Sequence, residues 1–569
     1  MSKFKSLIKI ALQVVTFIII STTLKAKNLD IYYDSNRVSD YLIGSINLNE
    51  NDYAKSYKYL KKLDGLEDFH IKFSTLYQYS LINLKKYKEA FNYAKKLEKK
   101  NLDNFESNLI IGVYYLKYEK YDLALKYFQN MNKKSNQIPL QNLLSNSLLG
   151  WIKSGNIKSL SENSLLSFIP ERFQNIKKIQ SAFLNCFYDS ANTNIKFKDL
   201  TKDGSINFSR YNFFYASYLY SQGNKDSSKK VINEALEQFP RNLLLKQFKM
   251  EITNNTKKMN NFDCKNISHN IAELFYISAN ALSSQSMYTS SNFYLSLAEF
   301  LNSNFISFKT LHAENFNEMK NYKRSKEIYK KIKISDSVYD WFAAKQIANI
   351  MIKNSKELES IKYLKNIFEK IDQPNIYEIY DYAEFLKRNE KFKEAIDYYS
   401  KALKLINKNH KLYAPITDGR GVAYERIGEW DKAEKDFLNS LSVKPDQAYV
   451  INYLAYSWIE QGVKIEKSLK MLEKANELKK NDGYITDSLG WALFKLKRFK
   501  DASKYLQTAV QIMPSDPVVN DHYGDSLWMT GEKLQARYYW NYVLNLEKAE
   551  DKLKEKIKNK IIFGLNLKL

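Results

Sequence analysis

The chain has 569 residues, which is too long for one ordinary hydrophobic core, so it must form several domains or a repeat array. Only 16 Gly and 8 Pro interrupt it, a scarcity that argues against many short strands and favours long helices joined by brief loops. With 44% hydrophobic residues, the composition excludes a chain that stays disordered for want of a core.

Lysine and arginine together exceed aspartate and glutamate by 25. Such a balance suits nucleic acid, an anionic membrane surface or an acidic polymer. The lysines are spread along the whole chain, however, and no compact arginine-rich cluster stands out. We therefore interpret the excess mainly as solvated surface, with a basic binding face as the alternative, and we expect no nucleic-acid partner.

The N-terminus has the pattern of a signal peptide over residues 1–26. Lys3, Lys5 and Lys9 precede the apolar run from Ile10 to Ile20, and Ala26 fits the small-residue cleavage pattern in part. We expect export to the periplasm with cleavage after Ala26. The alternative is an uncleaved N-terminus, which would anchor the protein in the inner membrane with its repeats in the periplasm.

Internal self-similarity at a period near 34 residues organises the rest of the chain. Segment 490–514 aligns on segment 421–445 with the same internal offsets of 12 and 24 residues. Small residues at the matched places let two antiparallel helices approach closely, and a large residue four positions after each alanine fills the space beside them. The matched pairs are Gly421 and Gly490, Ala433 and Ala502, and Pro445 and Pro514; Gly524 and Ala536 continue the series, and the large residues are Phe437, Leu506 and Trp540.

This pattern resembles the tetratricopeptide-repeat (TPR) family, whose signature places small residues at the two helix crossings and often proline near the end of the repeat. The resemblance implies an all-α TPR solenoid, a right-handed superhelix of antiparallel helix pairs. It covers nearly all of the mature chain and is most specific from about residue 376 onward. The run from Asn481 to Trp540 is similar to the C-terminal repeats of TPR proteins from Gram-negative cell envelopes.

Extended along the chain, the frame predicts one small or buried anchor in the first helix of each pair. A glycine seven residues past the anchor marks the turn in several repeats. Three anchors fit the frame least well, because the residues at their second-helix positions depart from the pattern: Gln78 with Ala90, Leu148 with Leu160, and Ala182 with Asn194. The anchors are Gly44, Gln78, Gly112, Leu148, Ala182, Ala216, Ala279, Ala313, Ala348, Ala383, Gly421, Ala455, Gly490 and Gly524, and the turn glycines are Gly155, Gly223, Gly428, Gly462 and Gly531.

One interval breaks the rhythm, because Ala216 and Ala279 are 63 residues apart and enclose the polar stretch from Asn254 to Asn261. We expect a hinge or loop there, between two superhelices. The predicted organisation is therefore divergent TPR-like repeats over residues 27–253, an irregular connection over 254–270, a TPR array over 271–547, and a capping helix and tail over 548–569.

No residue pattern in the sequence predicts catalysis. The five histidines fall in distant repeats, and no metalloprotease, nucleophile-elbow, phosphate-loop or dinucleotide motif occurs. We interpret His522 and Asp525 as a polar pair that faces a groove. Cys186 and Cys264 give no disulfide framework, and we expect two separate small buried residues. The chain is predicted to be no enzyme and to hold no cofactor or metal.

The resemblance implies a concave face lined by three positions of each first helix. In the C-terminal repeats these positions are rich in acids and aromatics, which suits a peptide with basic and apolar side chains rather than a carboxylate clamp. The alternative is that Trp491 and Trp528 only pack between neighbouring helices. The predicted partner-binding residues are Asp418, Glu425, Asn452, Tyr456, Asp487, Trp491, Phe494, Asp521, Asp525 and Trp528.

The sequence thus predicts a non-catalytic scaffold of the cell envelope that binds a protein or peptide segment in a concave acidic and aromatic groove, within an envelope assembly complex. The alternative, from another class, is a lysine-rich surface that binds an anionic polymer or membrane headgroups.

Overall fold

The computed structural model describes residues 35–134, 138–155, 165–202, 209–256, 259–334 and 337–565. These residues form helices and no strand, apart from an isolated bridge between Asn260 and Phe305, which confirms the all-α class. Among them, no helix combines the length and the hydrophobicity that a membrane span needs. The predicted signal segment, residues 1–26, lies outside the described residues.

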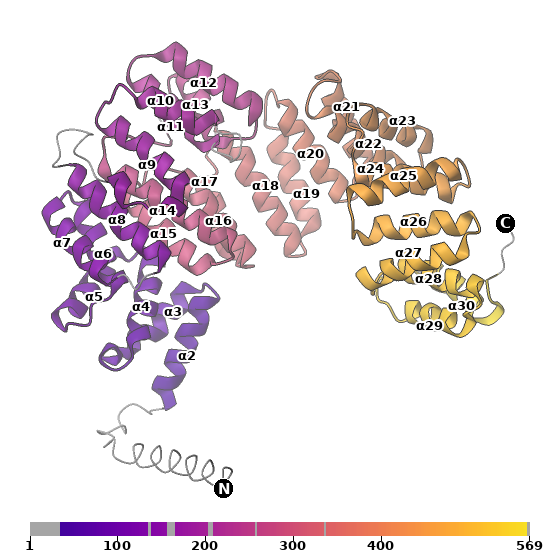
Figure 1. Cartoon of the computed structure of the whole chain (residues 1–569), viewed down its shortest axis with the longest axis horizontal. Helices are drawn as coiled ribbons and strands as arrows, with labels where there is room; N and C mark the ends of the chain where they lie inside the picture. The colour runs from indigo at the N-terminus through magenta and orange to yellow at the C-terminus, as the bar shows by residue number, and fades with distance from the viewer. Residues whose placement is uncertain are drawn as a thin grey trace, which may run out of the picture. The chain divides into compact units, whose positions relative to one another are not determined.

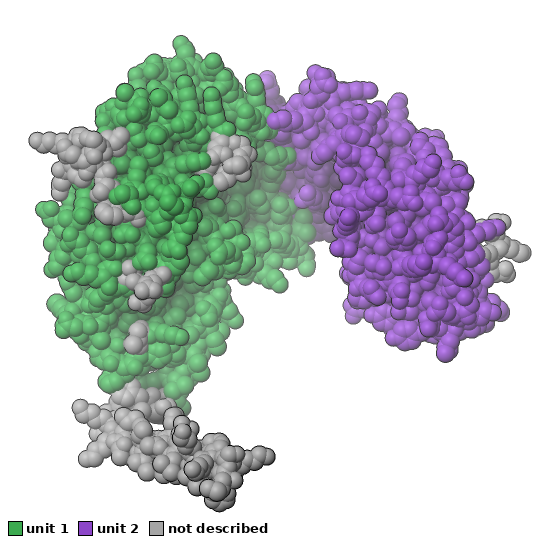
Figure 2. All heavy atoms as spheres, viewed as in Figure 1, with its two compact units in different colours: residues 1–356 green, residues 357–569 purple. Residues whose placement is uncertain are grey.

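The chain separates into two compact units, residues 1–356 and 357–569 (Figure 2). The helices of unit 1 are α2 (Ser35–Asn49), α3 (Tyr53–Leu60), η2 (Lys61–Leu63), η3 (Leu66–Asp68), α4 (Ile71–Asn83), α5 (Tyr87–Lys99), α6 (Phe105–Lys117), α7 (Tyr121–Lys133), α8 (Pro139–Ser154), η5 (Leu165–Phe168), η6 (Glu171–Phe173), α9 (Gln174–Phe187), α10 (Thr193–Lys202), α11 (Ser209–Ser221), α12 (Lys225–Gln238), α13 (Leu243–Asn254), α14 (Ile267–Ser284), α15 (Tyr288–Leu301), α16 (Ser307–Glu318), α17 (Tyr322–Ile332) and α18 (Val338–Lys353).

Unit 2 is a regular array of helix pairs that ends in a single helix (Figure 1). Its helices are α19 (Glu357–Phe368), α20 (Ile376–Arg388), α21 (Phe392–Lys404), α22 (Tyr413–Arg426), α23 (Trp430–Val443), α24 (Ala448–Glu460), α25 (Ile465–Leu478), α26 (Gly483–Lys495), α27 (Phe499–Ile512), α28 (Pro517–Thr530), α29 (Lys533–Leu544) and α30 (Asp551–Phe563). The last helix agrees with the capping helix predicted after residue 547.

The helix crossings are as tight as the repeat frame predicts. Every predicted anchor, from Gly44 to Gly524, is buried. A Cβ added at Gly490 would lie 2.6 Å from Leu506, and one at Gly524 would lie 2.5 Å from Trp540, so the two helices of each pair leave no room for a side chain there. These large residues are the ones predicted to fill the crossing.

The turn within each helix pair requires a left-handed residue, but not always glycine. Gly223, Gly428 and Gly531 have φ values of 81°, 82° and 99°, in the region that favours glycine. Gly155 also lies in the turn that follows its helix, α8, but with a φ of −64°. Lys497 takes the left-handed turn position in its own repeat, with a φ of 62°.

The weaker repeats follow the frame in part. Ala90 is fully buried, as a second-helix small residue should be, whereas Asn194 is exposed and its neighbour Thr193 is buried instead. The helical phase of α10 is therefore shifted by one residue from the predicted frame. Leu160 lies outside the described residues.

The irregular connection exists, but it does not divide the chain. The backbone between the end of α13 at Asn254 and the start of α14 at Ile267 lies inside unit 1. Asn260 is buried there, where its Oδ1 accepts from Ser307 N at 3.0 Å and its Nδ2 donates to the Tyr339 hydroxyl at 3.1 Å. The expected hinge between two superhelices at this connection is thus wrong, because the connection belongs to unit 1 and Asn260 is fixed by α16 and α18.

After this connection the chain turns back onto the first helices of earlier repeats. Helix α14 packs on α8, and α15 packs on α4 and α6 (Figure 1). Tyr79 stacks on Phe293 with ring centroids 4.3 Å apart, and Lys117 Nζ donates to the carbonyl of Leu301 at 3.1 Å. The face where α4, α6 and α8 would line a binding groove is therefore covered by the chain itself.

A disulfide bond between Cys186 and Cys264 holds this arrangement, with the two Cα atoms 6.0 Å apart. Cys186 lies in α9, and Cys264 precedes the start of α14. The prediction of two separate buried cysteines is wrong: only Cys186 is buried, and 78 residues of sequence separate two residues that the return of the chain brings together.

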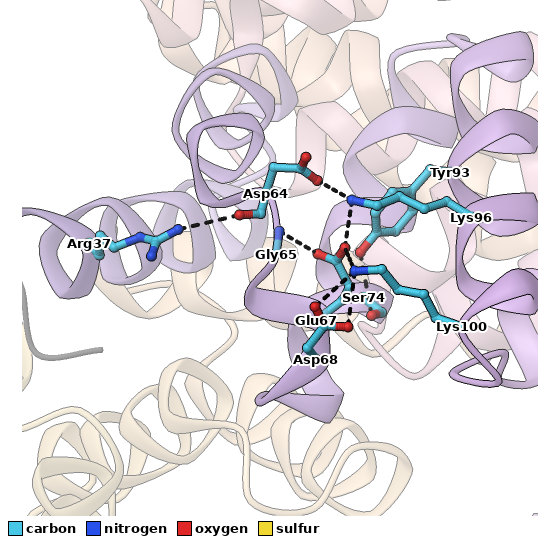
Figure 3. Close-up of polar contacts among 9 residues, drawn as sticks. All are labelled: Arg37, Asp64, Gly65, Glu67, Asp68, Ser74, Tyr93, Lys96 and Lys100. Carbon is cyan, nitrogen blue, oxygen red and sulfur yellow. Dashed lines mark hydrogen bonds and ion pairs between the residues drawn. The ribbon is translucent and has the colours of Figure 1, made fainter. Parts of the chain in front are cut away.

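An ion-pair network ties α5 to the turns that follow α3 (Figure 3). Lys96 contacts Asp64 and Glu67, and Lys100 contacts Glu67 and Asp68. The Glu67 side chain is fully buried, which alone would raise the pKa of its carboxyl, but hydrogen bonds from the two lysines lower it below its ordinary value. These lysines belong to the internal structure and not to a free basic surface.

Candidate functional site

Unit 2 has an open groove with a volume of about 620 Å³ on the side of its first helices. Of the ten predicted binding residues, four line it: Glu425, Asn452, Tyr456 and Asp487. The groove also takes in side chains that the prediction missed, contributed by α22, α23, α24, α26 and the start of α28: Arg426, Trp430, Tyr453, Ser457, Glu460, Gln461, Tyr484, Ser488, Asp516, Val518 and Val519. We call this surface the unit 2 groove.

The unit 2 groove is acidic and aromatic. Its four carboxylates come from Glu425, Glu460, Asp487 and Asp516, whereas Arg426 is the one cationic side chain among the lining residues. Arg426 is already engaged, because its Nη2 donates to the Tyr453 hydroxyl at 3.1 Å.

Tyr456 lies where these negative charges converge. Burial is the largest cause that raises the pKa of its hydroxyl, and Glu460, Asp487, Asp521 and Asp516 raise it further. The four carboxylates oppose a negative charge on the Tyr456 hydroxyl, so they favour a positively charged group beside this ring.

Two acceptors of the groove have no donor within the described part of the chain. Glu425 Oε2 and Asn452 Oδ1 are buried atoms without a hydrogen-bond partner, and the nearest cation to Glu425 Oε2 is Arg426 Nε at 3.5 Å. A buried acceptor without a donor is unfavourable by about 1–3 kcal/mol. A bound group that donates hydrogen bonds would remove this penalty.

Asp487 also has a structural partner. Its Oδ2 lies 3.0 Å from His522 Nδ1, on the first helix of the next repeat. Burial would lower the pKa of His522, but Asp487 and then Asp521 and Asp525 raise it above its ordinary value. The sequence pattern predicted a pair between His522 and Asp525. In the structure, His522 pairs instead with Asp487 of the preceding repeat.

The aromatic residues Trp491 and Phe494 are packing residues. Trp491 is 8% exposed and stacks on His522 with ring centroids 3.9 Å apart, and its Nε1 donates to Glu460 Oε1 at 2.7 Å. Phe494 is 4% exposed and stacks on Trp491. The alternative considered for Trp491, packing between neighbouring first helices, is correct, and neither ring lines the groove.

The last repeat is covered by α30. Lys560 Nζ lies 2.6 Å from Asp521 Oδ1 and 2.7 Å from Asp525 Oδ1. Trp528 is half-buried, and Gly564 packs so closely on its ring that a Cβ there would lie 2.1 Å away. Asp521, Asp525 and Trp528 are therefore engaged by the C-terminal helix and its end, and they do not line the groove.

Asp418 lies in α22 outside the groove lining. Burial, with Glu384 nearby, raises the pKa of its carboxyl to about 6, although Lys387 opposes this shift.

Some of the missed residues lie at helix ends. Tyr484 and Asp516 lie at the starts of first helices, and Glu460 is the last residue of α24. The prediction used three positions of each first helix, whereas the groove also takes in residues at the ends of these helices. Two tyrosines and a tryptophan beside acids near helix ends would have been the usable signal.

No grouping of three or more histidine, cysteine, aspartate or glutamate side chains in the described parts of the chain could hold a metal ion. The two buried histidines, His312 and His522, each pair with one carboxylate, of Glu299 and Asp487 respectively.

Comparison with known proteins supports the repeat assignment. No protein-family model matches the chain. A segment of 106 residues is 29% identical to the TPR repeat-containing protein PA4667 of Pseudomonas aeruginosa, and covers 19% of this chain and 18% of that protein. The chain thus matches about a fifth of the length of this curated relative.

Similar solved structures include a tetratricopeptide repeat protein from Parabacteroides merdae, with 16% identity, 38% of this chain and 85% of that chain covered, and a TM-score of 0.32. They also include MamA from Desulfovibrio magneticus, with 16% identity, 31% and 97% covered, and a TM-score of 0.27. A third is YrrB, titled a TPR protein with an unusual peptide-binding site, with 17% identity, 34% and 96% covered, and a TM-score of 0.27.

The antiparallel helix pairs and the buried anchors at the repeat period are those of an all-α tetratricopeptide-repeat solenoid, and one segment of the chain is similar to a TPR repeat-containing protein.

Proposed function

We propose that this protein is a non-catalytic scaffold of the cell envelope that captures a segment of another protein in the unit 2 groove. The observation that carries the proposal is the contrast between the two units. In unit 1, α14 and α15 cover the first helices of earlier repeats, whereas in unit 2 the first helices leave an open groove. Affinity in such a groove would come from a few aromatic anchors such as Tyr484, whose side chain is 58% exposed.

Two features support the export of the protein. The first is the signal-like pattern of residues 1–26. The second is the disulfide bond between Cys186 and Cys264, because disulfides persist in oxidising compartments such as the bacterial periplasm and are rare in the cytosol. We therefore place the scaffold in the periplasm, free or anchored to the inner membrane by an uncleaved N-terminus.

An unbiased peptide library tests the function. A displayed library of random 15-residue peptides, on the order of the length that an extended segment needs to cross three repeats, is selected on the full chain. The enriched peptides are then measured against a variant in which Ser457→Trp fills the groove. We expect peptides that bind the wild-type chain and lose binding to this variant, because Ser457 lines the groove.

The matched control is Ser442→Trp, which adds the same side chain at an exposed position of α23 outside the groove lining. Both variants should keep the helical circular dichroism of the wild type. Peptides that bind all three chains equally, or no enrichment at all, would refute groove binding. Salt-sensitive binding of polyphosphate in place of peptides would favour the anionic-polymer alternative.

A further inference from the structure

The polar groups of the unit 2 groove are mostly acceptors. Its carboxylates outnumber its cations, and Glu425 Oε2 and Asn452 Oδ1 are buried without a hydrogen-bond donor. Arg426 donates from its Nη2 to Tyr453 and pairs with Glu425 Oε2 only at 3.5 Å through its Nε. An occupant that brought further acceptors would leave these groups unsatisfied. The groove therefore needs hydrogen-bond donors, preferably with a positive charge.

The neighbouring repeats show how the chain satisfies the same kind of site. Asn452, Asp487 and Asp521 stand at equivalent positions of three successive repeats. The next helix supplies a histidine to Asp487 and a lysine to Asp521, at 3.0 and 2.6 Å. For Asn452 Oδ1 the described part of the chain supplies no hydrogen-bond donor, and the nearby Glu425 Oε2 has only Arg426 Nε, at 3.5 Å and without a hydrogen bond. A bound group that donates hydrogen bonds would satisfy these acceptors.

The aromatic lining has the same preference. Tyr456 is half-buried among carboxylates, and Trp430 and Tyr453 line the groove beside it. The faces of such rings attract ammonium and guanidinium groups. Lys560 offers an internal precedent, since its ammonium lies between two carboxylates and 5.9 Å from the centre of the Trp540 ring.

We propose that the unit 2 groove anchors a lysine or arginine side chain of a partner protein at Asn452, Tyr456 and the surrounding carboxylates. Lysine and arginine are the side chains that carry several donors and no acceptor. This inference rests on the proposed function and adds the chemistry of the partner segment. It commits to a protein segment because the groove extends over four first helices, farther than one small cation can reach.

Fluorescence anisotropy with defined peptides tests the inference on the full chain. Three labelled 15-residue peptides have the same leucine and phenylalanine positions and carry lysine, glutamine or glutamate at the remaining sites. We expect the lysine peptide to bind and the other two to bind at least about tenfold more weakly. Glu425→Gln combined with Asn452→Leu should weaken the lysine peptide by about tenfold, because the first change removes a negative charge and the second removes an orphan acceptor.

The matched control is Asp446→Asn, which removes one negative charge from unit 2 at an exposed carboxylate outside the groove lining. It should leave the lysine peptide within about twofold of wild type, since an exposed charge contributes little. An equal loss in the control and the groove variant would show long-range attraction only, and would overturn the inference.

Two further outcomes overturn the inference while leaving groove binding in place. One is that the glutamine peptide binds as tightly as the lysine peptide and depends on the same groove variants. The other is that free spermidine displaces the lysine peptide at equal concentration, which would assign the groove to a small polycation. Failure of the library selection, in contrast, would remove the proposed function itself.

Discussion

Asp525 and Lys560 form an ion pair between α28 and α30, with Lys560 Nζ 2.7 Å from Asp525 Oδ1 and the Asp525 side chain only 4% exposed. Lys560 also contacts Asp521, so one lysine of the capping helix pairs with two carboxylates. Burial and the neighbouring Asp521 raise the pKa of Asp525 to about 7, although Lys560 opposes this shift. Acids that look like a binding strip in the sequence are thus part of the contact that closes the end of the array.

Lys560→Met should destabilise unit 2 by about 3–5 kcal/mol near pH 8, because it leaves two buried carboxylates without their cation. Urea unfolding of the full chain, followed by circular dichroism, measures this loss. Lys558→Met, at an exposed position of the same helix, should change stability by less than about 0.5 kcal/mol. Equal effects of the two substitutions would show that the Lys560 contacts contribute nothing.

Ala502→Leu should destabilise unit 2 by about 1–3 kcal/mol, because it overpacks the crossing of α26 and α27. Ala502 is fully buried, and the first helix of this pair is so close that a Cβ at Gly490 would lie 2.6 Å from Leu506. The melting temperature of the full chain measures the effect. Leu at Lys504, whose side chain is 78% exposed, should change it little; a similar shift in both variants would mean that the helical phase is wrong.

The sequence predicted the regular part of this fold because the small residues at each crossing leave a period that can be read directly. Gly490 and Gly524 meet Leu506 and Trp540 as their spacing implied. It could not predict that α14 and α15 return to earlier repeats, since contacts such as Tyr79 with Phe293 join residues far apart in the chain without any periodic signal. The pairing of Cys186 with Cys264 follows from that return and was missed for the same reason.

Only part of the candidate site could be predicted from the sequence, because contacts between helices leave no signal in the spacing of residues. Helical spacing placed Asn452, Asp487 and Asp521 on one face, which is correct, but spacing does not reveal what the next helix brings to each of them. His522 and Lys560 engage the latter two, and of the three residues only Asn452 and Asp487 line the open groove.

Replacing both cysteines by serine should destabilise unit 1 by about 4–5 kcal/mol in the chain-entropy account, because the bond closes a long loop. The loop spans 78 residues between Cys186 and Cys264. Hydrogen exchange of α9 and α14 measures the loss, and the amides of unit 2 serve as the internal control. Unchanged protection of α9 and α14 in the double variant would show that packing alone holds the returning helices.

Glu299 gives unit 1 a pH-dependent stability that can be measured directly. Burial would raise the pKa of its carboxyl, but His312, with Nδ1 2.9 Å from Glu299 Oε1, and Lys85 lower it from 4.5 to about 2. A carboxyl whose pKa is lower in the folded protein stabilises that protein above the pKa of the unfolded chain. This stabilisation is lost as the pH falls from about 4.5 to about 2.

Glu299→Gln should therefore reduce the free energy of unfolding of unit 1 by on the order of 3 kcal/mol at pH 7, and the difference from wild type should disappear as the pH approaches 2. Urea unfolding at several pH values, read through amides of α15 and α16, measures this difference. Glu327→Gln serves as the control, because Glu327 is 45% exposed in its pair with Arg324 and such pairs contribute about 0–1 kcal/mol. A difference between Glu299→Gln and wild type that stays constant from pH 7 to pH 2 would contradict the assigned role of the Glu299 carboxylate, because an uncharged packing effect has no reason to follow its titration.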